Sequence, residues 1–130
     1  MSRGLLDTSV FIAQEGRGLD VSALPDEVAV SVVTYGELRA GVLAATDVSV
    51  RSRRLSTLQT VAGLHPLPVD TAVADEWARL RLLLATAGRR VTVNDTWIAA
   101  TALAHDVPVV TQDTDYAALA GISDLRVIPV

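Results

Sequence analysis

Residues 107–115 read Val-Pro-Val-Val-Thr-Gln-Asp-Thr-Asp, a short apolar run that leads into a polar turn with two aspartates. The β-branched residues predict a buried strand over Val107–Val110, because such side chains pack well in a sheet. Gly4-Leu5-Leu6 has the same apolar character, and Asp7 follows it directly. Both stretches therefore indicate strands of a sheet that carries acidic side chains where its strands end.

The rest of the chain alternates between helical and extended patterns. His65-Pro66 and Leu67-Pro68 exclude a helix interior, so Leu64–Val69 is expected to be extended. Strands that alternate with helices predict one α/β domain over residues 1–130, with a parallel sheet covered by helices. Further strands are expected at Val28–Ser31 and Leu125–Ile128. The first two helices are expected after a cap at Thr8 or Ser9 and over Thr34–Ala45, and the third from Asp47 or Ser49 to about Ala62. The last three are expected from Asp70 or Thr71 to Ala87, where Gly88 ends the helix, from a cap at Asn94 through His105, and over Asp115–Ala120.

The composition excludes several classes of protein. The chain has no cysteine and no lysine, and all eleven basic residues are arginine. Zinc–thiolate sites, thiol nucleophiles, phosphate-loop NTPases and Schiff-base enzymes are therefore excluded. Half of the residues are hydrophobic, yet no segment has the pattern of a membrane helix or a signal peptide, so we expect a soluble, cytoplasmic protein. Its net charge of −4 repels nucleic acid unless arginine clusters or a metal ion intervene.

Several carboxylates fall at positions where an open α/β sheet forms its active site. Asp7 and Asp113 follow strands, Asp115 lies two residues further on, Asp95 lies at the start of a helix, and Glu37 is on a helix expected to face the same edge. Such a cluster repels itself unless a cation is bound, and Mg²⁺ and Mn²⁺ prefer oxygen ligands. A bound divalent cation can activate water and stabilise a leaving oxygen, so metal-assisted phosphodiester hydrolysis is the reaction class that fits.

Each acid also has an ordinary structural explanation. Asp7 and Asp95 could be helix caps, because acids suit the first turn of a helix. Residues 111–115 could form a simple turn, and Glu37 could pair with an arginine in solvent. The coincidence of all these segments at one edge of the sheet favours a site.

Polar neighbours of the acids leave two interpretations open. The hydroxyls of Ser9 and Thr111 could orient the adjacent carboxylates or could cap backbone N–H groups. The arginines at 51, 53 and 54 and at 89 and 90 could follow an RNA backbone, although a solvated helix face is the commoner explanation.

Four motifs resemble those of a known family in order and spacing. They are Leu6-Asp7-Thr8-Ser9, Glu37-Leu38-Arg39-x-Gly41, Asn94-Asp95-x-x-Ile98-Ala99-Ala100-x-Ala102 and Thr111-x-Asp113-x-Asp115-Tyr116. The chain resembles PIN-domain ribonucleases, and more narrowly the VapC toxins of bacterial type II toxin–antitoxin systems. The resemblance covers nearly the whole chain and implies a PIN-like α/β/α sandwich, a Mg²⁺- or Mn²⁺-dependent endoribonuclease, and a homodimer inhibited by a VapB-type antitoxin.

The same resemblance assigns roles to residues. Asp7, Glu37, Asp95 and Asp113 match the acidic quartet of the family, and Asp115 matches an occasional additional ligand. Asp7 and Asp95 are the first choices for metal binding, with Asp113 and Asp115 as further ligands. Glu37 and Asp113 complete the shell and position the attacking water. Tyr116 stands where phenylalanine is more usual, a difference expected to affect only packing.

Two other functions and one surface follow from the residues. A phosphoryl-transfer domain with Asp7 as nucleophile is disfavoured, because such families require a lysine and the chain has none. A non-catalytic PIN-like module that binds RNA or protein is the alternative, and a broken quartet would indicate it. The apolar helix over Asp75–Ala87 has leucines on several faces, which suggests part of a dimer surface.

Overall fold

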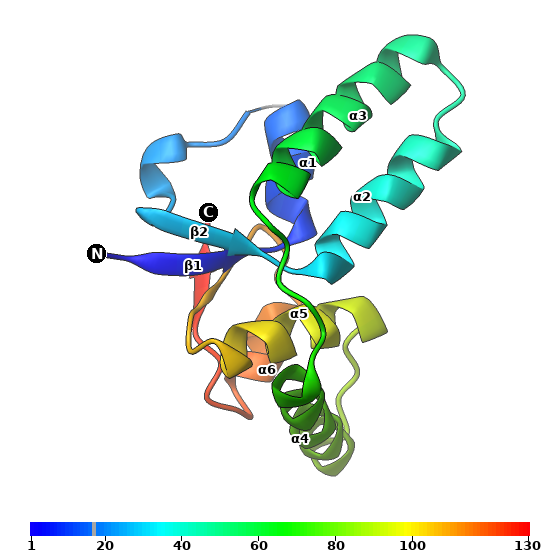
Figure 1. Cartoon of the computed structure of the whole chain (residues 1–130). Coiled ribbons are helices and arrows are strands. Elements are labelled where there is room, and N and C mark those ends of the chain that lie inside the picture. The colour runs from blue at the N-terminus through cyan, green and yellow to red at the C-terminus, as the bar shows by residue number, and fades with distance from the viewer. Residues whose placement is uncertain (17) are drawn as a thin grey trace.

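The computed structural model describes residues 1–16 and 18–130, in which four parallel strands lie between two layers of helices (Figure 1). The strands are β1 (Arg3–Leu6), β2 (Glu27–Val30), β3 (Val109–Thr111) and β4 (Val127–Pro129), in the sheet order β2-β1-β3-β4. The helices are α1 (Thr8–Glu15), α2 (Val32–Ala44), α3 (Val48–Gly63), α4 (Thr71–Ala87), α5 (Val93–Ala104) and α6 (Tyr116–Ala120), with a short 3-10 helix η1 (Val21–Ala23). The predicted α/β/α sandwich with a central parallel sheet is confirmed.

Alternation along the central strands assigns each side chain to one of two cores. Leu5 of β1 pairs with Val109 of β3, and both pack against α4, α5 and α6. Leu6 pairs with Val110, and both pack against α1, α2 and α3. Successive side chains of a strand point to opposite faces, so each strand contributes to both cores. All four of these residues are buried, which fixes β1 and β3 in the middle of the molecule.

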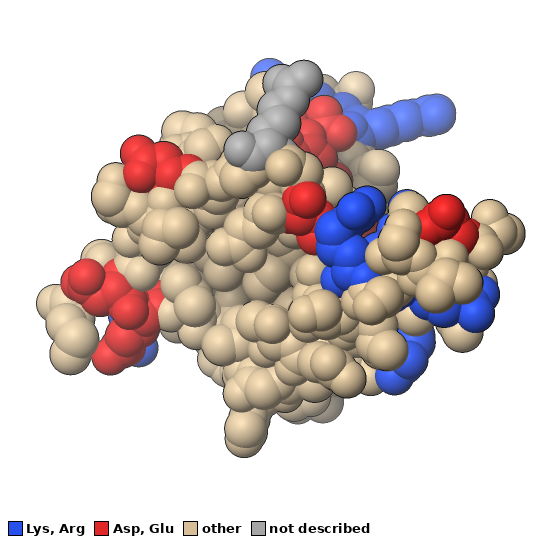
Figure 2. Space-filling model, turned by 90° about the horizontal axis from the view of Figure 1, so that it is seen from above, with Lys and Arg blue, Asp and Glu red and all other residues tan. Residues whose placement is uncertain are grey.

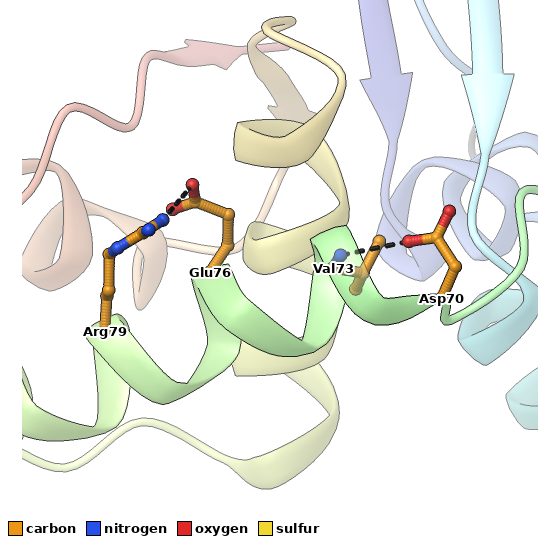
Figure 3. Close-up of polar contacts among 4 residues, drawn as sticks. All are labelled: Asp70, Val73, Glu76 and Arg79. Atoms are coloured by element: carbon orange, nitrogen blue, oxygen red, sulfur yellow. Dashed lines mark hydrogen bonds and ion pairs between the residues drawn. The ribbon is translucent and has the colours of Figure 1, made fainter.

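Three predicted helix ends are confirmed. Asp47 begins α3, where its carboxylate accepts a hydrogen bond from the Val50 N–H at 3.0 Å. Asp70 begins α4 in the same way, with the Val73 N–H at 3.0 Å (Figure 3). Gly88 ends α4 in the left-handed conformation, with φ of 65°, which costs a glycine little.

The strands and one connection differ from the prediction in their limits. β3 begins at Val109 because Pro108 has no N–H, although the Pro108 carbonyl still accepts a hydrogen bond from Leu5 N at 2.8 Å. β2 ends at Val30, and Ser31 instead caps α2 through the Val33 N–H. The expected extended segment Leu64–Val69 pairs with the sheet only at Leu67, as an isolated bridge.

The start of α5 also differs from the prediction. The cap is Thr92 and not Asn94, because the Thr92 hydroxyl accepts a hydrogen bond from the Asp95 N–H at 3.2 Å. Asn94 therefore lies within the first turn of the helix. This shift leaves the Asp95 side chain available for other contacts.

Charged side chains are unevenly distributed on the surface. In the view from above, arginines gather on the side where α2 and α3 extend beyond the sheet, and acidic residues form separate groups (Figure 2). Two α3 arginines are tied to α2, since Arg51 donates to the Ala45 carbonyl at 2.6 Å and Arg54 to the Gly41 carbonyl at 2.8 Å. These two arginines brace the α2–α3 pair. Among the described helices, none is long and apolar enough to cross a membrane.

Candidate metal centre

Asp7 lies where β1 turns into α1 and is almost completely buried. Its N–H donates to the Val110 carbonyl at 3.1 Å, which ties the end of β1 to β3. Asp7 occupies the N-cap position of α1, but its side chain makes no capping hydrogen bond. Thr8 and Ser9, the predicted caps, lie inside the helix. The side chain of Asp7 is only 3% exposed, so a carboxylate is held in the interior without serving the helix.

Asp7 meets two other carboxylates that come from distant parts of the chain. Asp95 lies in the first turn of α5, and Asp113 follows β3. One carboxylate oxygen of each of the three residues lies within 4.8 Å of those of the other two. The fold therefore concentrates negative charge beyond the carboxyl ends of β1 and β3. We call these three residues the carboxylate triad.

Burial and mutual repulsion both disfavour the charged state of the triad. Burial raises the pKa of Asp7 to about 6, and the negative charges of Asp95 and Asp113 add to this, while the Ser9 and Thr111 hydroxyls partly oppose it. Burial also raises the pKa of Asp95, with repulsion from Asp113 and Glu37 in the same direction. A bound cation would relieve the strain on both groups.

Two hydroxyls connect α1 to the turn after β3. Ser9 donates to the Asp7 carboxylate at 2.6 Å and lies 3.3 Å from the Thr111 hydroxyl. The same two oxygens accept the backbone N–H groups of Gln112, at 3.0 Å, and Asp113, at 2.8 Å. Ser9 therefore both orients the Asp7 carboxylate and accepts a hydrogen bond from a backbone N–H group. The two roles that the sequence left open for this hydroxyl, orienting a carboxylate or binding a backbone N–H, apply together.

Glu37 and Asp115 lie outside the triad. The Glu37 carboxylate accepts a hydrogen bond from the Thr8 hydroxyl at 2.7 Å, and no ion pair joins Glu37 to an arginine among the described residues. Asp115 is exposed, and its N–H donates to the Asp113 carboxylate at 2.9 Å. The turn expected at residues 111–115 is thus present, and it holds Asp113 in place. Thr8, which the sequence suggested only as a cap, links Glu37 to the end of β1.

Comparisons with known proteins agree with this geometry. The profile of the PIN domain matches residues 4–122. Ribonuclease VapC5 of Mycobacterium tuberculosis is 56% identical over 128 residues, which cover 98% of this chain and 95% of that protein. The chain belongs to the VapC branch of the PIN-domain family. Ribonuclease VapC4 of the same organism is 48% identical and covers 98% of this chain and 97% of its own.

A solved structure places this VapC-family chain in the same fold. A chain from the crystal structure of VapBC-5, a member of the VapBC family of toxin–antitoxin systems from Mycobacterium tuberculosis, superposes with a TM-score of 0.91. The two chains are 53% identical, and the match covers 100% of each. The PIN-like sandwich implied by the sequence motifs is therefore confirmed.

The donor set of this VapC-family chain suits a hard divalent cation. The triad offers only oxygen atoms, and none of the described residues near it supplies sulfur, since the chain has no cysteine. Mg²⁺ and Mn²⁺ bind such oxygens, often through one or two carboxylates and several waters. The residues present therefore fit the ion that the family implies.

Tyr116 contradicts one expectation drawn from the sequence. Its ring is fully buried at the start of α6, but its hydroxyl donates to the Asp95 carboxylate at 3.1 Å. The substitution of tyrosine for phenylalanine therefore adds a contact to the triad and does not affect packing alone. The interpretation failed because the sequence does not show that α6 and the first turn of α5 face each other.

A Tyr116→Phe variant is expected to fold normally and to bind Mn²⁺ up to about 10-fold more weakly, because groups that orient a metal ligand typically contribute 10- to 100-fold to affinity or activity. Calorimetric titration with Mn²⁺ measures this directly. The matched control is Tyr35→Phe, since the Tyr35 hydroxyl accepts a hydrogen bond from Arg39 on α2 and is not part of the triad. Equal Mn²⁺ affinities for the two variants would contradict the assigned role.

Proposed function

We propose that this chain is a Mg²⁺- or Mn²⁺-dependent endoribonuclease, the toxin of a type II toxin–antitoxin system. The observation that carries the proposal is the carboxylate triad, which brings three distant segments of a VapC-family chain together into one site of carboxylate oxygens. Relatives at 56% and 48% identity are named ribonucleases. The proposal treats residues 1–130 as one PIN domain that acts on RNA in the cytoplasm.

The residues divide the chemical work between them. Asp7, Asp95 and Asp113 hold the ion, with Asp115 as an additional ligand from the adjacent turn. When bound, a divalent cation lowers the pKa of a water molecule and stabilises charge on a phosphate oxygen. Glu37 and Asp113 orient the attacking water, and Thr8 fixes the Glu37 carboxylate. Ser9 and Thr111 hold Asp7 and the turn that bears Asp113.

The partner in this proposal is a VapB-type antitoxin. The structural relatives include chains from VapBC toxin–antitoxin assemblies, among them VapBC-5. A concentrated acidic site attracts a cationic side chain, and an arginine would make charge-assisted hydrogen bonds there. Such an arginine of the antitoxin would therefore compete with both the metal ion and the RNA for this site.

We further expect a homodimer. Leu82 is 68% exposed and Leu83 is 37% exposed on α4, the helix that the sequence marked as a dimer surface. Association of two such faces would remove these side chains from water. Light scattering at tens of micromolar tests this expectation, and a strict monomer would contradict it.

A non-catalytic RNA- or protein-binding module is the alternative. In a module of this kind the acidic residues would have only structural roles, such as capping the ends of helices. Neither Asp7 nor Asp95 caps its helix with its side chain, which favours the catalytic proposal.

The test is cleavage of total cellular RNA by the purified protein, free of antitoxin, with Mg²⁺, Mn²⁺ or EDTA. We expect defined fragments only with metal, and their loss in an Asp95→Asn variant, because the triad is then incomplete. Asp124→Asn is the matched control, since this exposed residue precedes β4 and so lies toward the amino-terminal ends of the parallel strands, whereas the triad lies beyond their carboxyl ends. Fragments that persist in EDTA, or equal activity of the Asp95→Asn and Asp124→Asn variants, would contradict the proposal.

A further inference from the structure

A second feature of the surface lies between α4 and α5. It is a pocket of about 300 Å³ whose lining includes Trp77, Arg81, Arg89, Arg90 and Thr96. Thr96 directly follows Asp95 in the first turn of α5, so this helix contributes residues to both the pocket and the triad. No function described above uses this pocket.

The pocket is positively charged in a chain of net negative charge. Three arginines line it, and no acidic side chain does so among the described residues. The ion pairs found in residues 1–16 and 18–130 are Arg79–Glu76 and Arg126–Asp106, so none of the three pocket arginines is neutralised in this way (Figure 3 shows the first pair). Three uncompensated guanidinium groups around one hollow form a site for anions, and arginine suits phosphate through its forked donors.

Trp77 lines the pocket and holds one of its arginines in place. Trp77 stacks on Trp97 with ring centroids 4.5 Å apart and an interplanar angle of 7°. The Arg81 guanidinium lies 4.9 Å from the centre of the Trp77 ring, which holds its charge at the pocket by a cation–π contact. The Trp77 indole Nε1 is buried and has no hydrogen-bond partner within the part of the chain that the structure describes. Because this nitrogen is enclosed by protein, a ligand in the pocket would meet the arginines and not the indole N–H.

We propose that this pocket binds the phosphate backbone of the RNA strand that the triad cleaves. The inference rests on the proposed ribonuclease function and adds the surface that holds the substrate. An RNA strand approaching three carboxylates in a protein of net charge −4 is repelled, so a cationic surface would help the bound metal ion to hold it. The three arginines would contact the phosphates of this strand.

The two tryptophans allow this site to be observed directly. The chain contains only Trp77 and Trp97, so all of its tryptophan fluorescence arises from this stack. Titration with a short, mixed-sequence, single-stranded RNA in EDTA measures binding without cleavage. We expect the RNA to change the emission of the unsubstituted protein.

An Arg89→Gln/Arg90→Gln variant is expected to bind this RNA at least about 10-fold more weakly. The slope of log affinity against log salt is expected to fall by about 1.4, because each phosphate contact with a single strand contributes about 0.7. In cleavage assays with metal, KM rises while kcat is retained, since the triad is untouched. The charge-matched control is Arg3→Gln/Arg126→Gln, two exposed arginines on β1 and just before β4 that do not line the pocket.

The outcomes separate this inference from the proposed function. If the unsubstituted protein cleaves RNA but both double variants have the same RNA affinity and salt slope, the inference is wrong and the ribonuclease proposal stands. If RNA binds through Arg89 and Arg90 but no RNA is cleaved with any metal, the pocket is supported and the catalytic proposal fails. If RNA leaves the emission unchanged while dilution of the protein alone alters it, the pocket is a contact between copies of the chain and the RNA inference is overturned.

Discussion

An Asp7→Asn variant is expected to lose at least about 100-fold in RNA cleavage and, without metal, to be more stable than the unsubstituted protein. The loss follows because a direct metal ligand contributes at least as much as the groups that orient it, which typically account for 10- to 100-fold. The gain in stability follows because the Asp7 carboxylate is only 3% exposed and is repelled by Asp95 and Asp113. An asparagine retains the acceptor for the Ser9 hydroxyl and removes the buried charge.

The size of the stability gain follows from the pKa of Asp7. A rise from 3.8 to about 6 corresponds to about 3 kcal/mol at neutral pH as an upper limit, since one pKa unit is about 1.4 kcal/mol. Denaturant unfolding in EDTA at neutral pH measures the free energy of unfolding, and Asp124→Asn is again the surface control. A variant that is both inactive and less stable would show that Asp7 supports the fold and not the chemistry.

The metal itself is expected to stabilise the protein, and the effect is expected to depend on pH. A ligand that binds only the folded state adds about 2.7 kcal/mol at 100 times its Kd, so Mn²⁺ at neutral pH raises the Tm by several degrees. Protons compete with the ion for Asp7, whose pKa is about 6, so the same Mn²⁺ concentration produces a smaller shift at pH 5. Differential scanning fluorimetry with Mn²⁺ and EDTA at both pH values makes this comparison.

Without metal the pH dependence has the opposite direction. The folded state binds the Asp7 proton more tightly than the unfolded state, whose pKa is the ordinary 3.8. Stability from this group is therefore present at low pH and is lost as pH rises through about 6. Asp7 alone makes the metal-free protein about 1.4 kcal/mol more stable at pH 5 than at pH 7.5, and Asp95 adds in the same direction.

For the prediction on metal binding, a Tm that is insensitive to Mn²⁺ at both pH values would contradict the metal site.

The position of the site could be predicted because local chemistry and strand order act together. Val107–Val110 and Gly4-Leu5-Leu6 were identified as strands by their side chains alone, and both lie in the centre of the sheet. The acids that follow them were therefore assigned to one edge. Helix ends marked by strong local signals, such as Asp70 and Gly88, were also correct.

Features set by contacts between distant segments could not be predicted. The hydrogen bond from Tyr116 to Asp95 depends on how α6 packs on α5, and no local pattern encodes it. The sequence drew attention to the pocket arginines at 89 and 90. The pocket that they line together with Arg81 and Trp77 forms only where α4 packs on α5. The cap of α5 was misplaced by two residues because both Thr92 and Asn94 are good caps, and only the structure shows which one accepts the N–H.

The pairing of β1 with β3 has a consequence for when the protein becomes active during its synthesis. Leu5 lies beside Val109, so β1 must wait for β3, which the ribosome makes much later, before it acquires this neighbour. Asp113 is translated later still. A nascent chain that stops before Asp113 therefore lacks the assembled triad, and the site cannot form in the cell until translation has passed this residue.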